Sequence, residues 1–150
     1  MTTDDRQKLL RAAMAAVRDC SETMETQAAS LLQALPAVAI DEGLRAAAID
    51  LGAGLKDAAS RVTFELALLQ TEMAEGTAAA GTVVQRLSSM DALMMRGVAA
   101  MADVVDALEK AAEHDETNER AFVLVIEATG IMLQALEKAK SATQALSAAG

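Results

Sequence analysis

Residues 10–34 read LRAAMAAVRDCSETMETQAASLLQA, and the spacing of the apolar side chains in this stretch decides the fold. Every seventh position is apolar, at Leu10, Val17, Met24 and Leu31. The positions three residues after each of these hold Ala13, Cys20, Gln27 and Ala34, and they complete the alternation of three-residue and four-residue steps. Steps of three and four place one buried stripe along an α-helix, and the seven-residue repeat is typical of helices that pack side by side. We therefore predict a long amphipathic helix that packs against other helices.

The composition extends this prediction to the whole chain. Of the 150 residues, 53% are hydrophobic, nine are Met and only two are aromatic, Phe64 and Phe122. Ala, Leu and Met favour helices, whereas sheets are enriched in aromatic and β-branched residues. The chain has one proline, Pro36, and eight glycines, so its elements must be few and long. We expect an all-α fold in a single domain over residues 1–150.

Turn signals divide the chain into four segments. Pro36 ends the first helix and Gly76 ends the second. The polar residues 113–120 separate a third helix from a fourth, although the lack of Gly or Pro there leaves one continuous helix over 77–149 as an alternative. The expected helices span residues 4–35, 41–75, 78–112 and 117–148.

Threonines stand where two of these helices begin. Thr2 or Thr3 can cap the first helix, and Thr77 can cap the third. A helix of roughly 30 residues is about 45 Å long at 1.5 Å per residue. Short connections force consecutive helices to run antiparallel, so we expect an elongated up-down-up-down four-helix bundle with coiled-coil-like packing.

The net charge of −9 and the pI near 4.5 argue against a nucleic-acid partner, because phosphate binding requires clusters of Lys and Arg. The first six residues, MTTDDR, lack the basic start and apolar run of a secretory signal, and no later segment is long and apolar enough to cross a membrane. We expect a soluble, cytoplasmic protein without a transmembrane segment. Its single cysteine, Cys20, lies on the buried stripe and should behave as a small hydrophobic residue.

The sequence lacks the residue sets that common catalytic sites require. The Glu-x-x-His pairs of a di-iron bundle are missing, because the single histidine, His114, lies in the polar segment before the fourth helix. Gly-rich phosphate loops, nucleophile elbows and Cys–His pairings are also missing. We therefore expect a protein that is not an enzyme and uses no cofactor or metal.

The expected fourth helix is apolar around most of its circumference. Residues 122–126 read FVLVI, and residues 131–133 read IML. A bundle helix buries about a third of its circumference, so the remaining apolar side chains need another cover. We expect an interaction surface made of Phe122, Val123, Ile126 and Leu133. Its partner would be a second copy in a homodimer or a client helix, which suggests an acidic adaptor or a protein similar to secretion chaperones.

A second hypothesis concerns the middle of the bundle. Counting from the turns places glycines of three helices at one level, and Gly inside a helix costs about 1 kcal/mol relative to Ala. This layer would be an apolar small-molecule pocket, close packing or a hinge. Its lining would be Cys20, Met24, Leu51, Gly54, Leu55, Met94, Gly97, Met101, Gly130, Ile131 and Met132. The Ala-rich, aromatic-poor composition is similar to that of phasins, and this resemblance implies binding to an apolar ligand or hydrophobic surface.

Acidic residues are expected to gather at one end of the bundle, where the first and third connections meet. This acidic pole comprises Asp41, Glu42, Glu113, His114, Asp115, Glu116 and Glu119. It would attract a basic partner or bind a divalent cation weakly, or its acids would simply favour the positive ends of helix dipoles. The segment His114-Asp115-Glu116-Thr117-Asn118 resembles the phospho-accepting helix of some sensor kinases, and this resemblance implies phosphotransfer through His114.

Overall fold

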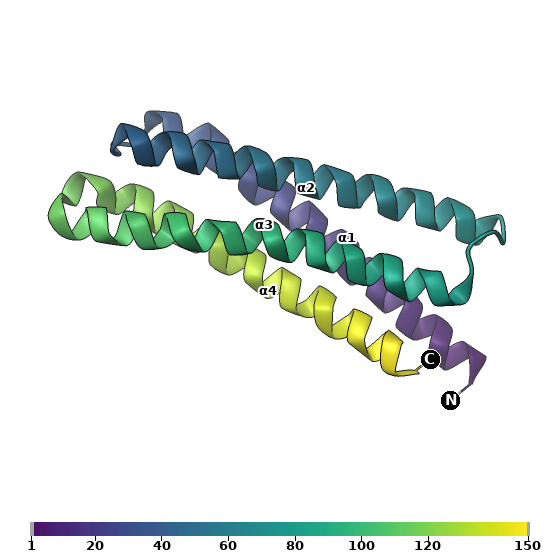
Figure 1. The fold of residues 1–150 in the computed structure, drawn as a ribbon. Helices are drawn as coiled ribbons and strands as arrows, with labels where there is room; N and C mark the ends of the chain where they lie inside the picture. Colours follow the sequence, from purple (N-terminus) through teal and green to yellow (C-terminus); the bar gives the residue numbers. More distant parts are fainter. Residues whose placement is uncertain (1, 150) are drawn as a thin grey trace.

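The computed structural model describes residues 2–149, which form an antiparallel bundle of four long helices (Figure 1). The helices are α1 (Thr3–Ala34), α2 (Glu42–Ala74), α3 (Ala80–His114) and α4 (Glu119–Ala149). Each helix packs against the next one in the chain, and α4 packs against α1 and closes the bundle. The all-α, up-down-up-down architecture predicted from the sequence is therefore confirmed.

The first helix begins and ends close to where its sequence signals place it. The Thr2 hydroxyl oxygen accepts a hydrogen bond from the Asp5 backbone N–H, and the Thr2 N–H donates to the Asp5 carboxylate, both at 3.2 Å. Two otherwise free amide groups are satisfied in this way. At the other end Pro36 falls within a 3₁₀ turn, η1 (Leu35–Ala37), which follows the last residue of α1.

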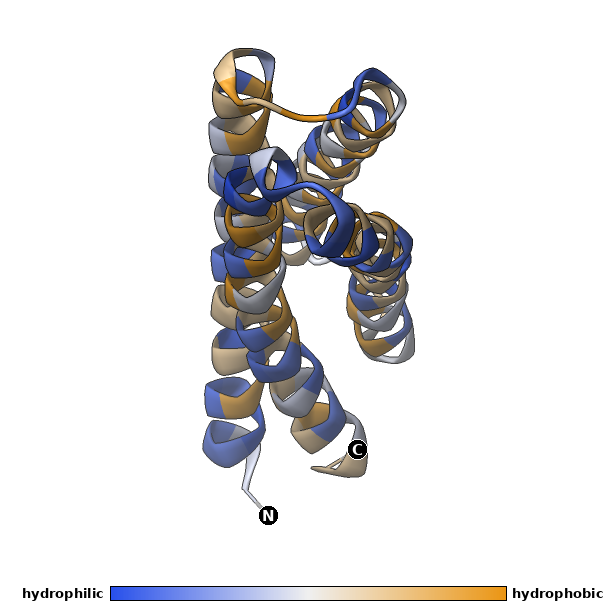
Figure 2. Ribbon diagram, turned by 90° about the vertical axis from the view of Figure 1, so that its left-hand side faces the viewer, coloured by the Kyte–Doolittle hydropathy of each residue, from blue (hydrophilic) through white to orange (hydrophobic). Residues whose placement is uncertain are grey.

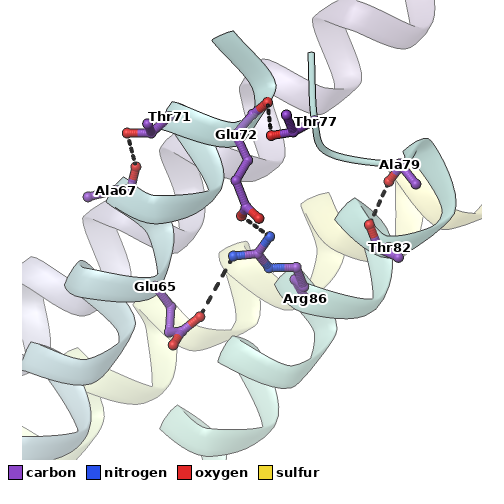
Figure 3. A network of polar contacts seen from close by, with 8 residues as sticks. All are labelled: Glu65, Ala67, Thr71, Glu72, Thr77, Ala79, Thr82 and Arg86. Carbon is purple, nitrogen blue, oxygen red and sulfur yellow. Dashed lines mark hydrogen bonds and ion pairs between the residues drawn. The ribbon is translucent and has the colours of Figure 1, made fainter. Parts of the chain in front are cut away.

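Gly76 ends the second helix as predicted, because it adopts a positive φ of 73° that favours glycine. The prediction for Thr77 is wrong. Its hydroxyl donates to the Glu72 carbonyl at 3.1 Å, so it satisfies the end of α2, and α3 starts only after Ala79 (Figure 3). The Arg86 guanidinium adds a link from α3 to the carboxylates of Glu72 and Glu65 on α2.

The polar segment between α3 and α4 is a turn, so the alternative of one continuous helix is wrong. Asp115 is extended, with φ −147° and ψ 113°, and its carboxylate accepts the Thr117 backbone N–H at 3.0 Å. A 3₁₀ turn, η2 (Glu116–Asn118), then leads into α4. Short side chains that bond to nearby backbone groups can break a helix without Gly or Pro.

The core is a continuous aliphatic and thioether cluster that runs along the bundle axis. Four of its largest members are fully buried methionines, Met24, Met94, Met101 and Met132. One polar contact crosses between α1 and α2 beside this core, a 2.7 Å hydrogen bond between the hydroxyls of Ser21 and Thr63.

Two connections lie at one end of the bundle, and the α2–α3 connection lies at the other, near both chain ends (Figure 1). Figure 2 looks onto the end with two connections, where the α1–α2 connection is largely hydrophobic and the α3–α4 connection is strongly hydrophilic. None of the helices in the described part of the chain combines the length and apolarity that crossing a bilayer requires.

Candidate functional site

Helix α4 carries exposed apolar side chains, as predicted. Val123, Ile126 and Leu133 are 41%, 42% and 42% exposed, respectively. Phe122, the fourth predicted member of this surface, is half-buried and packs against the core. Ile131 is also exposed, at 45%, although it was predicted to line an internal pocket.

These side chains point in different directions around α4. Phe122, Ile126 and Leu133 are spaced by four and seven residues, so they form one stripe along the helix. The stripe lies on the side of α3, because Leu136, one turn after Leu133, lines the groove between α3 and α4. Met95 of α3 lines the same groove and is 37% exposed. We call these four residues, Phe122, Ile126, Leu133 and Met95, the α3–α4 apolar face.

The other exposed apolar residues do not belong to this face. Val123 lies midway between the buried Ala121 and Val125 in sequence, which turns it away from the core. On α2, Phe64 is 68% exposed and Leu68 is 42% exposed. Sequence analysis missed this second pair, although both residues lie outside the three-four series of buried positions in their helix.

The predicted glycine layer is only partly inside the bundle. Gly97 packs closely, since a Cβ built there would lie 3.1 Å from Leu55 Cδ2 and 3.7 Å from Met24 Cε. Gly54 and Gly130 are exposed, and a Cβ at either would meet nothing within 4 Å. The structure therefore corrects the placement of these two glycines and of Ile131, which face away from the core.

The remaining residues of that predicted lining stay together at the centre of the bundle. They comprise the buried Cys20, Met24, Leu55, Met94, Met101 and Met132 and the half-buried Leu51. Gly97 supports the close-packing alternative at this level, because its missing side chain lets α3 approach Leu55 of α2.

The acidic pole residues all lie at the end where two connections meet, and all of them are exposed. The two connections are joined by Asn118, which is fully buried and accepts the Asp41 backbone N–H through its Oδ1 at 3.0 Å. The Thr117 N–H holds the pKa of Asp115 below its usual value. Glu42 pairs with Arg45, whose guanidinium also donates to the Val38 carbonyl at 2.9 Å.

Within residues 2–149, no three His, Cys, Asp or Glu side chains lie in an arrangement that could hold a metal ion. His114 is the last residue of α3, and its side chain is exposed. The imidazole therefore projects from a helix end beside a turn, whereas the resemblance to sensor kinases implies a position along a continuous helix.

A polar group that sequence analysis missed lies beside the core between α3 and α4. Asp91 is only 8% exposed and lines a surface groove together with Thr143 and Lys140. The sequence did contain a signal for this site, because Asp91 follows Met90 at the edge of the buried stripe. An acidic residue at such an edge is either buried or lies at the mouth of a groove.

Burial dominates the titration of this region. Desolvation raises the pKa of Asp91, and the Thr143 hydroxyl and the Lys140 charge lower it by smaller amounts. Burial, with a smaller effect from the Asp91 charge, raises the pKa of the Cys20 thiol to about 12. Cys20 is therefore a protonated core residue at neutral pH, as its place on the stripe suggested.

Comparison of the chain with protein-family models, with curated proteins and with solved structures finds no match.

Proposed function

We propose that this protein is a non-enzymatic, cytoplasmic helical bundle that acts through protein–protein interaction, as an adaptor or chaperone-like protein. The α3–α4 apolar face is the contact surface, and its partner is an amphipathic helix. In the simplest assembly that helix is α4 of a second copy, which gives a symmetric homodimer.

The observation that carries this proposal is the stripe on α4. Ile126 and Leu133 stand seven residues apart on one side of a continuous helix, and each is more than 40% exposed. Full burial of a side chain of this size contributes about 1.5–3 kcal/mol, so covering the stripe favours association. A seven-residue repeat is also the spacing at which two helices meet along a common seam.

The neighbours of the stripe suit a contact surface. Phe122 and Met95 extend the apolar area, and the flexible thioether of Met95 can adapt to a partner. The exposed Glu137 and Lys140 follow Leu133 by one and two turns and provide a charged rim. Apolar centres with polar rims are the usual organisation of protein interfaces.

Sedimentation analysis of the purified protein tests this proposal. The wild type is expected to sediment as a dimer at micromolar concentrations, and the double variant Ile126→Gln/Leu133→Gln as a monomer. The matched control is Phe64→Gln/Leu68→Gln, which removes two exposed apolar side chains from α2 on the diagonal from α4 and should leave the dimer intact. Circular dichroism verifies that both variants remain helical.

Two outcomes would contradict the proposal. A wild-type protein that stays monomeric at high concentration does not self-associate through this face. Equal loss of the dimer in both double variants would mean that exposed apolar area in general, and not the α4 stripe, drives association.

A further inference from the structure

The groove between α3 and α4 has the size and composition of a small-molecule site. Its volume is about 360 Å³, which falls in the range of pockets that hold small ligands. Helix α3 contributes Ser88, Asp91, Ala92 and Met95 to its walls. Helix α4 contributes Leu136, Lys140, Thr143, Gln144 and Ser147. The groove thus joins a buried acid, an apolar wall and several hydroxyl and amide groups.

Asp91 has hydrogen-bonding capacity that the protein leaves unused. Its side chain is more than nine-tenths buried, and no donor among residues 2–149 reaches its Oδ1. The Thr143 hydroxyl lies near enough to lower the pKa of Asp91, but it also donates to the Ala139 carbonyl at 2.9 Å, and its single proton serves only one of these acceptors at a time. A buried carboxylate oxygen without a donor is energetically unfavourable, so a ligand that supplies a donor is favoured.

The charge of Asp91 is also incompletely balanced. Lys140 lowers the pKa of Asp91 from the mouth of the groove, yet none of the ion pairs within 4 Å in the described chain includes either residue. Burial raises the energy of the ionised carboxylate, and a cation placed beside it recovers part of that cost. A positively charged donor in the groove therefore offsets the charge, and it satisfies the free oxygen once the carboxylate turns toward the groove.

Apolar side chains beside Asp91 select for an apolar body on that cation. Met95 is one of the few large apolar side chains exposed on the surface, and it lines the groove with the buried Leu136. Its flexible side chain can close over a short alkyl chain. Ser88, Gln144 and Ser147 offer oxygen acceptors for the remaining N–H bonds of an ammonium group.

We propose that the α3–α4 groove binds a small primary alkylammonium ion. The ammonium group donates to the Asp91 carboxylate, and a small rotation of that carboxylate brings its free oxygen into the groove. The alkyl chain lies on Met95 and Leu136. Lys140 acts as a competing cation that the ligand displaces from the neighbourhood of Asp91.

NMR titration with n-butylammonium tests the proposal, with n-butanol and butyrate as probes of similar shape but different charge. Butylammonium is expected to give saturable shifts at the Met95 methyl group and at the amides of Ser88 and Thr143. Butanol should bind at least about tenfold more weakly, which corresponds to about 1.4 kcal/mol. Equal binding of the amine and the alcohol, tighter binding of butyrate, or no saturable shift with the amine would overturn the proposal.

Variants of the two charged residues sharpen the test. Asp91→Asn should weaken butylammonium binding by about tenfold, whereas Asp103→Asn, at an exposed acid on the same helix, should leave it unchanged. Lys140→Gln should tighten binding, because it removes the competing cation. Weaker butylammonium binding in the Lys140 variant would contradict the competing role of Lys140, and butyrate binding that Lys140→Gln abolishes would show that the groove selects an anion. If Asp91→Asn does not fold, the comparison of amine and alcohol on the wild type still decides. The groove shares Met95 and Lys140 with the α3–α4 apolar face and its rim, but Ile126 and Leu133 do not line it. The Ile126→Gln/Leu133→Gln variant therefore measures amine binding in the absence of the proposed dimer, so the two proposals can be tested separately.

Discussion

At the scale of single residues, the glycines distinguish open helix surface from close packing. Ala in place of Gly54 should stabilise the protein by about 0.5–1 kcal/mol, because α2 gains helix propensity and the new Cβ meets nothing within 4 Å. Ala in place of Gly97 should gain less, since its Cβ would press on Leu55 at 3.1 Å. Thermal unfolding followed by circular dichroism measures both variants. Equal gains would mean that the Leu55 side chain moves aside at Gly97 without cost.

Asp91 provides a prediction about pH. Its pKa is raised in the folded protein, mainly by burial, so folding favours the protonated carboxyl. The stability that protonation contributes is fully present below the unfolded pKa near 3.8 and is lost as the pH rises through the folded value. Asp91→Asn should therefore be more stable than the wild type at pH 7, and this advantage should disappear at pH 3.

Urea unfolding at the two pH values measures the difference, with Asp103→Asn as the exposed control. An advantage independent of pH would assign the effect to packing and not to the buried charge.

At the scale of the elements, helix boundaries could be predicted because their signals are local. Thr2 and Asp5 cap the start of α1, Pro36 follows the end of α1, and Gly76 ends α2. Each of these signals lies within one turn of the boundary that it sets, so the sequence beside a boundary is enough to predict it. The Thr77 prediction failed because a threonine between two helices can serve either one, and here it bonds back to Glu72. Local sequence does not determine that choice.

The site was harder to predict than the helices, because it depends on the direction in which each side chain points around its helix. Counting from turns gives the level of Gly54 and Gly130 along the bundle, but neighbouring positions on a helix differ by about 100° in direction. Leu55 is buried, whereas the adjacent Gly54 is exposed. The burial of Asp91 likewise depends on how α4 lies against α3, which no local pattern encodes.

The contact between the two connections at the acidic pole gives a prediction at this scale. Asn118→Ala should destabilise the bundle by about 1–3 kcal/mol, because it leaves the Asp41 N–H without its acceptor and removes the bond from the Asn118 amide to the Ala111 carbonyl. Chemical denaturation measures the loss. Thr117→Ala is the control, since Thr117 is exposed and contributes its backbone N–H, which alanine retains. Similar losses in both variants would show that the α1–α2 connection is held by other contacts.

At the scale of the whole molecule, the net charge and the apolar face act against each other. Two copies that meet through α4 each carry a net charge of −9, so their mutual repulsion opposes a dimer held by apolar side chains. Salt shortens the distance over which charges interact, from about 10 Å at 0.1 M to about 3 Å at 1 M. The dissociation constant of the proposed dimer should therefore fall as sodium chloride is raised over this range, which sedimentation equilibrium measures directly.

The Ile126→Gln/Leu133→Gln variant should remain monomeric at every salt concentration, because screening removes repulsion but supplies no contact. A dimer that weakens with salt would be held mainly by ion pairs and not by the apolar side chains of the α3–α4 apolar face.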